Sequence, residues 1–301
     1  MSFEITTSFV SQFRSNLAML AQQKRSRLID RVTVEPAVGA TLYYDQIGAS
    51  QAQQRTTRHT DTMVANTPHR RRRIDLKVFD WADLIENADK ARLLADPTSS
   101  YVAAGNAAIN RAIDQEIINN FFATANTGDG GTTPVTFPAT QQVAVNSWAY
   151  GAGTGNAGLT VSKLIEARMI LFGQEAVDDL DEQDMPNTYI GVTAKQIGNM
   201  LSTTEATSKD YAEVQALVQG KISQFMGFQF VRLPNLPLDG SGYFRVPVWQ
   251  KEGVVLAVDD AATDVSIDIR ADKNRAIQPF YSKLFGAARV EEARVVEIKC
   301  L

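Results

Sequence analysis

The stretch DPTSSYVAAGNAAINRAIDQEIINNFFATANTGDGG, residues 96–131, decides the fold because it has the pattern of one long helix with clear ends. Asp96 suits the N-cap and Pro97 suits the first helical position. Large apolar residues then recur every four positions, at Ile109, Ile113, Ile117 and Phe121. A glycine-rich run follows and ends the pattern. We expect a helix over about 98–126, roughly 29 residues or about 43 Å long.

Upstream of this helix lies a long polar segment. Short strand patterns around Val34 and at 42–44 precede it. Residues 46–67 are almost bare of large apolar side chains, so they cannot bury a core of their own. The segment therefore predicts a long polar hairpin or a disordered loop, which needs either disorder or a partner surface. Four consecutive arginines follow it, at Arg70, Arg71, Arg72 and Arg73.

Downstream of the long helix the chain mixes helices with strands. Two further helices are expected over about 161–172 and 194–201, with a strand between them at 188–192. The end of the chain is rich in strands, which we expect at 253–258, 265–269, 276–285 and 294–299. Helices ahead of mostly antiparallel strands indicate the α+β class.

Composition and charge narrow the class of protein. Hydrophobic residues make up 44% and charged residues 21%, which is normal for a chain that buries a core. The net charge of -4 gives no general case for nucleic-acid binding. Residues 1–73 hold 11 of the 30 Lys and Arg but only 5 of the 34 Asp and Glu, so a basic first part precedes an acidic body. Neither a membrane-spanning run nor a signal peptide is found, and the single cysteine, Cys300, suits a reducing compartment.

The order of these elements, together with several local phrases, resembles the major capsid protein of tailed bacteriophages, the HK97-like fold. The phrases are GKISQFMGFQFV (220–231) with LPNLP (233–237), and GVVLAV (253–258), IDIRADK (267–273), GAARV (286–290) and VVEI (295–298). The resemblance implies an N-terminal arm, an E-loop hairpin, a peripheral domain that contains the long spine helix, and an axial domain. The implied boundaries are 1–34 for the arm, 35–73 for the E-loop, 74–158 with 262–301 for the peripheral domain, and 159–261 for the axial domain.

The resemblance implies a structural protein and no enzyme, with no cofactor. Copies of the chain would form pentamers and hexamers that close into an icosahedral shell around double-stranded DNA, held by non-specific contact. The implied partners are further copies of the chain, a separate scaffolding protein and a portal; a decoration protein is compatible with this plan, and a membrane is not part of it. The protein would be assembled in the host cytoplasm and end in the virion. Segment 36–73 contains no lysine and one asparagine, Asn66, so a lysine–asparagine crosslink from the loop is not expected.

Candidate interface residues come from the charged and amphipathic segments. The arginine run reads either as a solvated face or as a contact with acidic surfaces, which are a neighbour's carboxylates in preference to DNA phosphates. The arm with Phe9 and Phe13 packs either on its own domain or on a neighbouring subunit. The remaining candidates are two loop arginines and an acidic segment, namely Arg55, Arg58, Asp178, Asp179, Asp181 and Glu182. For the acidic segment, a solvated loop is favoured over a cation site because it lacks the spacing of an EF-hand.

Two other functions are open. An encapsulin nanocompartment would share the fold but hold a protein cargo. A nucleotide-binding enzyme could use GTGNAG, which runs from Gly153 to Gly158 and matches GxGxxG, if a strand led into the glycines. The chain has two histidines, His59 and His69, and both fall in the polar loop region, where a nucleophile and base are hard to assemble with Cys300.

Overall fold

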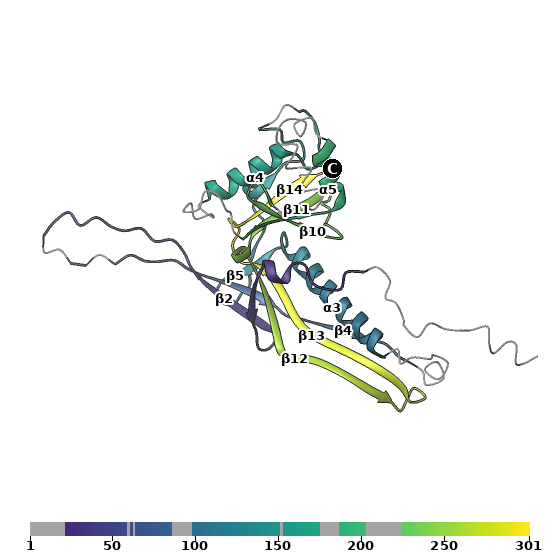
Figure 1. Cartoon of the computed structure of the whole chain (residues 1–301). Coiled ribbons are helices and arrows are strands. Elements are labelled where there is room, and N and C mark those ends of the chain that lie inside the picture. The colour runs from purple at the N-terminus through teal and green to yellow at the C-terminus, as the bar shows by residue number, and fades with distance from the viewer. Residues whose placement is uncertain are drawn as a thin grey trace, which may run out of the picture. The chain divides into compact units, whose positions relative to one another are not determined.

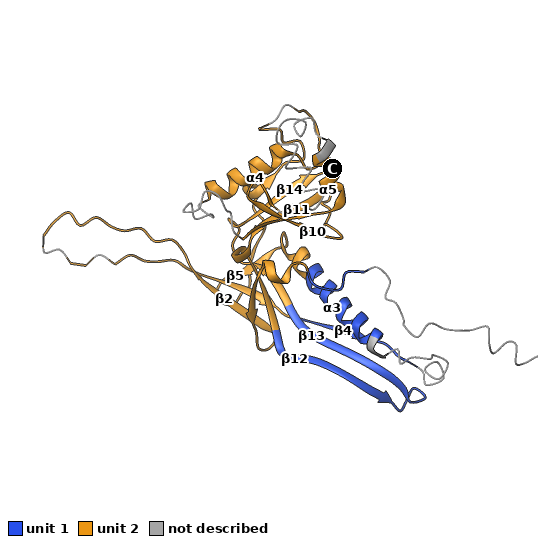
Figure 2. Ribbon diagram, viewed as in Figure 1, with its two compact units in different colours: residues 1–26, 77–115, 259–285 blue, residues 27–76, 116–258, 286–301 orange. Residues whose placement is uncertain are grey.

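The protein is described by a computed structural model, which covers residues 22–58, 61–62, 64–85, 98–150, 153–174, 187–202 and 224–301 (Figure 1). The chain forms two compact units, which Figure 2 colours separately. Unit 1 comprises Met1–Ser26, Lys77–Gln115 and Asp259–Phe285, and unit 2 comprises Arg27–Leu76, Glu116–Val258 and Gly286–Leu301. Three long elements, the helix α3 and the strands β12 and β13, run through both units. The chain is therefore α+β, as expected.

Unit 1 contains the first part of α3 (Thr98–Asn120), strand β4 (Lys77–Ala82) and the outer parts of β12 (Val254–Arg270) and β13 (Ala276–Arg289). Strands β13 and β4 pair antiparallel, and the rings of Phe79 and Phe285 stack with centroids 4.3 Å apart. The helix lies close to this sheet at Gly105, where a Cβ atom would overlap the ring of Trp81. Glycine is thus required at 105 because the indole occupies the space of a side chain.

The described end of the arm is fixed to the same helix by polar contacts. Asn110 Nδ2 donates to the carbonyl oxygen of Lys24 at 3.1 Å. The buried carboxylate of Asp114 accepts from Ser26 Oγ at 2.5 Å and also from the amide of Gln23. These bonds lie within one chain, so residues 22–26 pack on their own unit. Phe9 and Phe13 lie outside the described residues.

Unit 2 is built on a six-stranded sheet with the order β7-β14-β11-β8-β10-β9. Its strands are β7 (Gln142–Val143), β14 (Val295–Cys300), β11 (Phe244–Gln250), β8 (Thr188–Val192), β10 (Phe228–Arg232) and β9 (Gln224–Phe225). Helix α4 (Val161–Gly173) packs against β14 and β7, and α5 (Ala194–Ser202) follows β8. The side chain of Thr160 caps α4 by accepting from the Lys163 amide. The helices and the strand expected at 161–172, 188–192 and 194–201 are confirmed.

This sheet takes strands from both sides of the domain boundaries expected at 158 and 261. Strands β7 and β14 belong to the expected peripheral domain by sequence, yet they pair with each other and with β11 in the same sheet as β8 and β10. Strand β7 enters this sheet because it pairs in parallel with β14, a segment far along the chain. Unit 2 is therefore not the same division as the expected domains, whose boundaries stay a prediction.

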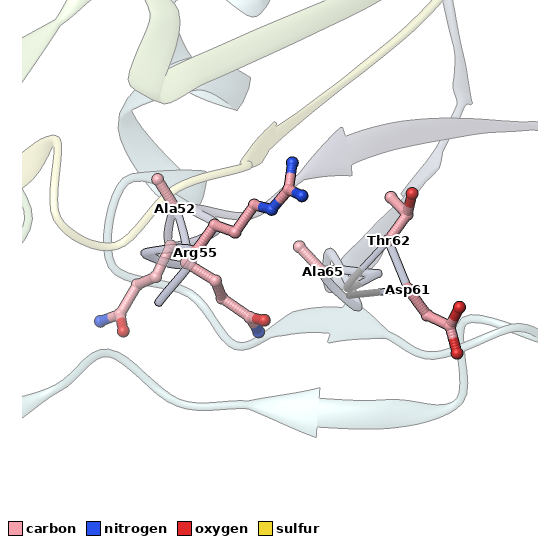
Figure 3. A pocket seen from close by; sticks show the side chains of 7 residues that line it. Ala52, Arg55, Asp61, Thr62 and Ala65 are labelled. Atoms are coloured by element: carbon pink, nitrogen blue, oxygen red, sulfur yellow. The ribbon is translucent and has the colours of Figure 1, made fainter. Parts of the chain in front are cut away.

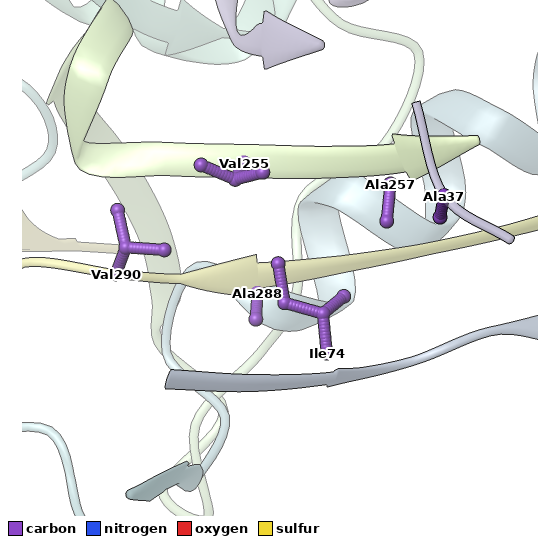
Figure 4. Packing of buried hydrophobic residues seen from close by; sticks show 6 residues of the cluster. All are labelled: Ala37, Ile74, Val255, Ala257, Ala288 and Val290. Carbon is purple, nitrogen blue, oxygen red and sulfur yellow. The ribbon is translucent and has the colours of Figure 1, made fainter. Parts of the chain in front are cut away.

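Two apolar clusters hold unit 2 together. Trp249 is fully buried, with its ring 4.7 Å from that of Phe121 and 5.7 Å from that of Tyr189. A second cluster joins β1 (Thr33–Pro36) and its neighbours to β12, β13 and the loop hairpin. Figure 4 shows its six members, Ala37, Ile74, Val255, Ala257, Ala288 and Val290. Because Ile74 belongs to the hairpin, this cluster fixes the hairpin base to the unit.

The hairpin itself pairs β2 (Thr41–Ile47) with β3 (His69–Asp75) in antiparallel register. Two short strands, β5 (Ala125–Thr127) and β6 (Thr133–Val135), complete its four-stranded sheet. The last bond of the paired part joins the Gly48 amide to the Pro68 carbonyl at 2.8 Å. Every described residue from 49 to 66 is exposed and outside regular secondary structure. The expected polar hairpin is confirmed.

The long helix differs from its expected length. Ile109, Ile113, Ile117 and Phe121 are all buried, as the four-residue repeat predicts. The helix ends at Asn120 rather than Asn126, because residues 125–127 pair with β3 as a strand. The guanidinium of Arg289 accounts for this end: its Nη1 donates to the carbonyl oxygens of Phe121 and Ala123, at 2.8 and 3.1 Å. The expected caps Asp96 and Pro97 lie outside the described residues.

Candidate functional site

The four arginines of β3 alternate between the two faces of the hairpin. Because successive side chains of a strand point to opposite faces, Arg70, Arg72 and Ile74 share one face while Arg71 and Arg73 share the other. On the first face, Ile74 lies in the apolar cluster, Arg72 is buried and Arg70 is exposed. Along this face, the strand therefore places an apolar core residue, a buried arginine and an exposed arginine within five residues.

On the other face, both arginines have partners within the chain. Arg71 makes a bidentate pair with Asp45, the residue directly opposite on β2, with Nε–Oδ1 and Nη2–Oδ2 distances of 2.6 and 3.1 Å. This bond lowers the pKa of the Asp45 carboxyl. The Arg71 guanidinium also lies over the Tyr43 ring, 5.4 Å from its centre. Arg73 pairs with Asp75 at 2.7 Å. These pairs are exposed, so each contributes little to stability.

Arg72 is the deepest of the four, with 3% of its surface exposed. Its Nε donates to the Val290 carbonyl at 3.0 Å, and its Nη2 donates to both carboxylate oxygens of Glu292, at 2.6 and 2.7 Å. Val290 and Glu292 lie in the turn between β13 and β14. The arginine thus ties the base of the hairpin to the end of the chain.

A second buried arginine shares the same carboxylate. Arg289 is fully buried and lies 3.6 Å from Glu292 by its Nε, while its Nη1 holds the end of α3. Burial lowers the pKa of the Arg289 guanidinium, and the Glu292 carboxylate opposes that effect by favouring the charged form. Two guanidiniums therefore share one carboxylate. This junction was missed from the sequence, although a charged residue in the apolar run LFGAARV (284–290) is a signal that could have found it.

Arg70 lines a cavity of about 320 Å³ beside this junction. The walls come from the end of β2 and the two residues after it, from β3 and from the turn after β13. Its lining includes Gln46, Ile47, Arg70, Glu291, Glu292 and Arg294. Arg70 is the arginine of the run that the structure leaves at an open, concave surface.

A second cavity, of about 340 Å³, lies between the two limbs of the loop. Figure 3 shows Ala52 and Arg55 on one limb and Asp61, Thr62 and Ala65 on the other. Arg55 Nε donates to the Thr57 carbonyl of its own limb at 3.0 Å, and Arg58 is exposed. The other charged candidates, Asp178, Asp179, Asp181 and Glu182, lie outside the described residues, as does His59.

The glycine-rich loop does not have the context of a nucleotide site. Residues 144–150, ahead of the glycines, are turns and irregular chain rather than a strand. A Cβ atom at Gly153 would overlap the Trp148 ring, and one at Gly158 would overlap the Asn199 amide. These two glycines are therefore explained by packing against their own chain.

Reactive groups are few in the part of the chain that the structure describes. Cys300 is buried, as expected for a small apolar group, and burial raises the pKa of its thiol to about 12. No cluster of three or more His, Cys, Asp or Glu that could hold a metal ion is found among the described residues. None of the described helices has the length and apolar character that crossing a membrane requires.

Several solved capsid structures match the fold of this chain. The capsid of Ralstonia phage GP4 matches with a TM-score of 0.71 at 12% identity, covering 97% of this chain and 95% of that chain. The capsid of cyanophage P-SCSP1u matches with a TM-score of 0.69 at 15% identity, covering 98% and 94%. The capsid of a native GTA particle matches with a TM-score of 0.67 at 14% identity, covering 97% and 96%. The fold is the HK97-like fold of tailed-phage capsid proteins.

The model of the phage capsid protein family matches residues 5–301. The chain therefore belongs to the phage capsid protein family. No curated protein matches the sequence. The protein is therefore a structural component of the phage head, and its place is the virion. The site described above is accordingly a candidate for contact between copies of the chain.

Proposed function

We propose that the chain is the major capsid protein of a tailed phage and forms pentamers and hexamers that close into an icosahedral head around double-stranded DNA. The observation that carries this proposal is the family match over residues 5–301 together with the matching fold over nearly the whole chain. The described residues between 49 and 66 are all exposed and support it, because a long polar segment with no core of its own gains its contacts from a partner. The protein acts by assembly and not as an enzyme.

Each part of the chain has a role in this proposal. The arm (1–34) and the E-loop (35–73) reach neighbouring subunits, the peripheral domain (74–158 and 262–301) carries the spine helix, and the axial domain (159–261) meets its copies around the symmetry axes. The candidate interface residues are those of the arm, the loop arginines and the acidic segment. The bidentate pair with Asp45 already gives Arg71 a carboxylate within its own chain, so this arginine has less need of a neighbour's carboxylate.

Further partners follow from the same function. A separate scaffolding protein guides assembly in the host cytoplasm, and a portal occupies one vertex. The packaged DNA meets the shell by non-specific contact, because basic side chains attract phosphates without reading the base sequence. A decoration protein on the outer surface is compatible with the proposal.

The test is expression of the chain with its scaffolding protein, followed by light scattering and analysis of the particle contents. The proposal expects large closed particles that package nuclease-protected DNA when the packaging machinery is present. Particles that hold a protein cargo and exclude DNA would instead favour an encapsulin-like compartment. Only monomers under assembly conditions would refute both.

A further inference from the structure

The cavity at the base of the loop hairpin has an unusual distribution of charge. Four ionic side chains line it, Arg70, Arg294, Glu291 and Glu292. Arg294 pairs with Glu291 at 2.6 Å and with Glu252 at 2.8 Å. Glu292 is held by Arg72 and Arg289, as described above. Three of the four lining charges are thus neutralised within the chain.

Arg70 is the exception. Within the described part of the chain its side chain has neither an ion pair nor a hydrogen bond, and the residue is exposed. The other three arginines of β3 all have carboxylate partners, so Arg70 differs from its immediate neighbours on the same strand. The buried Arg72 and Arg289 add positive charge behind the cavity wall, because the two guanidiniums share one carboxylate. Each also keeps a buried nitrogen without a hydrogen bond.

The surroundings of Arg70 suit a protein side chain. Gln46 is its cross-strand neighbour and adds an amide to the cavity. Ile47, the next residue, is 73% exposed and gives the cavity an apolar edge. A guanidinium, an amide and an apolar side chain in one concavity match a carboxylate that arrives with aliphatic carbon around it.

We infer that this cavity receives an Asp or Glu side chain from a second copy of the chain, with Arg70 as the docking group. The inference rests on the proposed function, which brings many copies together. A DNA backbone fits less well because the exposed Ile47 at the edge of the cavity suits the aliphatic carbon of a protein side chain rather than a phosphate. A volume of about 320 Å³ holds one side chain, and Arg presents a planar fork that a carboxylate matches with two hydrogen bonds.

The first experiment compares two neutral variants of neighbouring residues, Arg70→Gln and Arg71→Gln. Both are exposed or half-buried on the same strand, but Arg71 has its partner in its own chain. Arg70→Gln is expected to weaken assembly by about tenfold and to flatten its salt dependence, with the unfolding midpoint of the free subunit unchanged. Arg71→Gln is expected to assemble like the parent. Equal losses in the two variants, or no loss in Arg70→Gln, would overturn the inference.

The second experiment identifies the partner. Particles of Arg70→Lys are treated with a carbodiimide, which couples an amine directly to a carboxylate in contact with it, whereas arginine does not react. Peptide mapping by mass spectrometry is expected to find position 70 joined to an Asp or Glu of another subunit, a product that parent particles cannot give. Coupling of position 70 only to Glu291 or Glu292 of its own chain, or no coupling, would contradict the inference.

Different results would refute the proposed function and the proposed docking cavity. If the parent chain forms no particles, the proposed function fails. If the parent and Arg70→Gln both form normal shells, the proposed function stands and the docking cavity is refuted. If Arg70→Gln shells close normally but retain less DNA, the cavity faces the packaged nucleic acid and the subunit contact is refuted.

Discussion

Arg72 and Glu292 are separated by most of the chain and yet meet at 2.6 and 2.7 Å, where one guanidinium nitrogen donates to both carboxylate oxygens. The contact joins the loop hairpin to the turn that precedes the last strand. Since Glu292 also lies 3.6 Å from the buried Arg289, this one carboxylate connects the hairpin, the end of the long helix and the end of the chain. The proposed contact of the loop with a neighbouring subunit would need such a rigid base.

Removing this carboxylate is expected to be costly. Glu292→Gln leaves two buried guanidiniums without their shared counter-charge, and we expect the free energy of unfolding to fall by about 3 kcal/mol. Denaturant unfolding measures the change. The control is Asp75→Asn, which breaks the exposed pair with Arg73 and should cost less than about 1 kcal/mol. Similar small losses in both variants would show that the junction is not a structural centre.

A variant with a shortened loop distinguishes the effect of the loop on folding from its effect on assembly. Removal of residues 49–67, with a short turn joining Gly48 to Pro68, keeps the paired part of the hairpin, where β2 and β3 meet. Because the removed residues that are described bury no core, we expect the unfolding midpoint to stay the same while shell closure is blocked. Electron microscopy and thermal unfolding give the two readings. Normal shells from the trimmed chain would refute the role of the loop.

The contact between the long helix and β4 gives a test of packing. Gly105→Ala places a methyl group against the Trp81 ring and should destabilise the chain by about 1–3 kcal/mol. Gly198→Ala, in α5, is the matched control, because nothing lies within 4 Å of the added carbon there. That change should be neutral or stabilise by up to about 1 kcal/mol through helix propensity. A cost at 198 equal to that at 105 would contradict the packing described here.

Cys300 predicts how stability changes at alkaline pH. Burial raises the pKa of its thiol from 9.0 to about 12, so the folded chain holds this proton more tightly than the unfolded chain. Its contribution to stability is present below about pH 9 and is lost as the pH rises towards 12. Relative to Cys300→Ala, the parent should lose about 1.4 kcal/mol between about pH 8 and about pH 10.

Urea unfolding at the two pH values measures this difference. Lys163 has its pKa lowered by burial and so contributes the opposite slope in both proteins, while in the parent Cys300 opposes part of that lowering. A thiol reagent offers an independent check, since the folded chain should react only at the rate at which it opens. An identical pH dependence in parent and variant would contradict the burial of Cys300.

The sequence predicted local elements well because their signals are local. The four-residue repeat of Ile109, Ile113 and Ile117 marked the buried face of the long helix, and all three are buried. The absence of large apolar residues marked the loop. The end of the helix could not be predicted, because it depends on Arg289, which lies far along the chain and binds the carbonyls of Phe121 and Ala123.

The candidate site was predicted in part. The arginine run was recognised as the main charged feature, but its residues look alike in the sequence. Their different environments depend on strand alternation and on distant partners, so Arg72 is buried against Glu292 while Arg70 lines a cavity. The partners in the turn after β13 became visible only when the fold brought them to the hairpin.

The most direct test of the central claim is a negative-stain image of the purified chain after assembly with its scaffolding protein. The account predicts closed, uniform particles built of pentamers and hexamers. A field that contains only monomers or small oligomers of well-folded chain would contradict it.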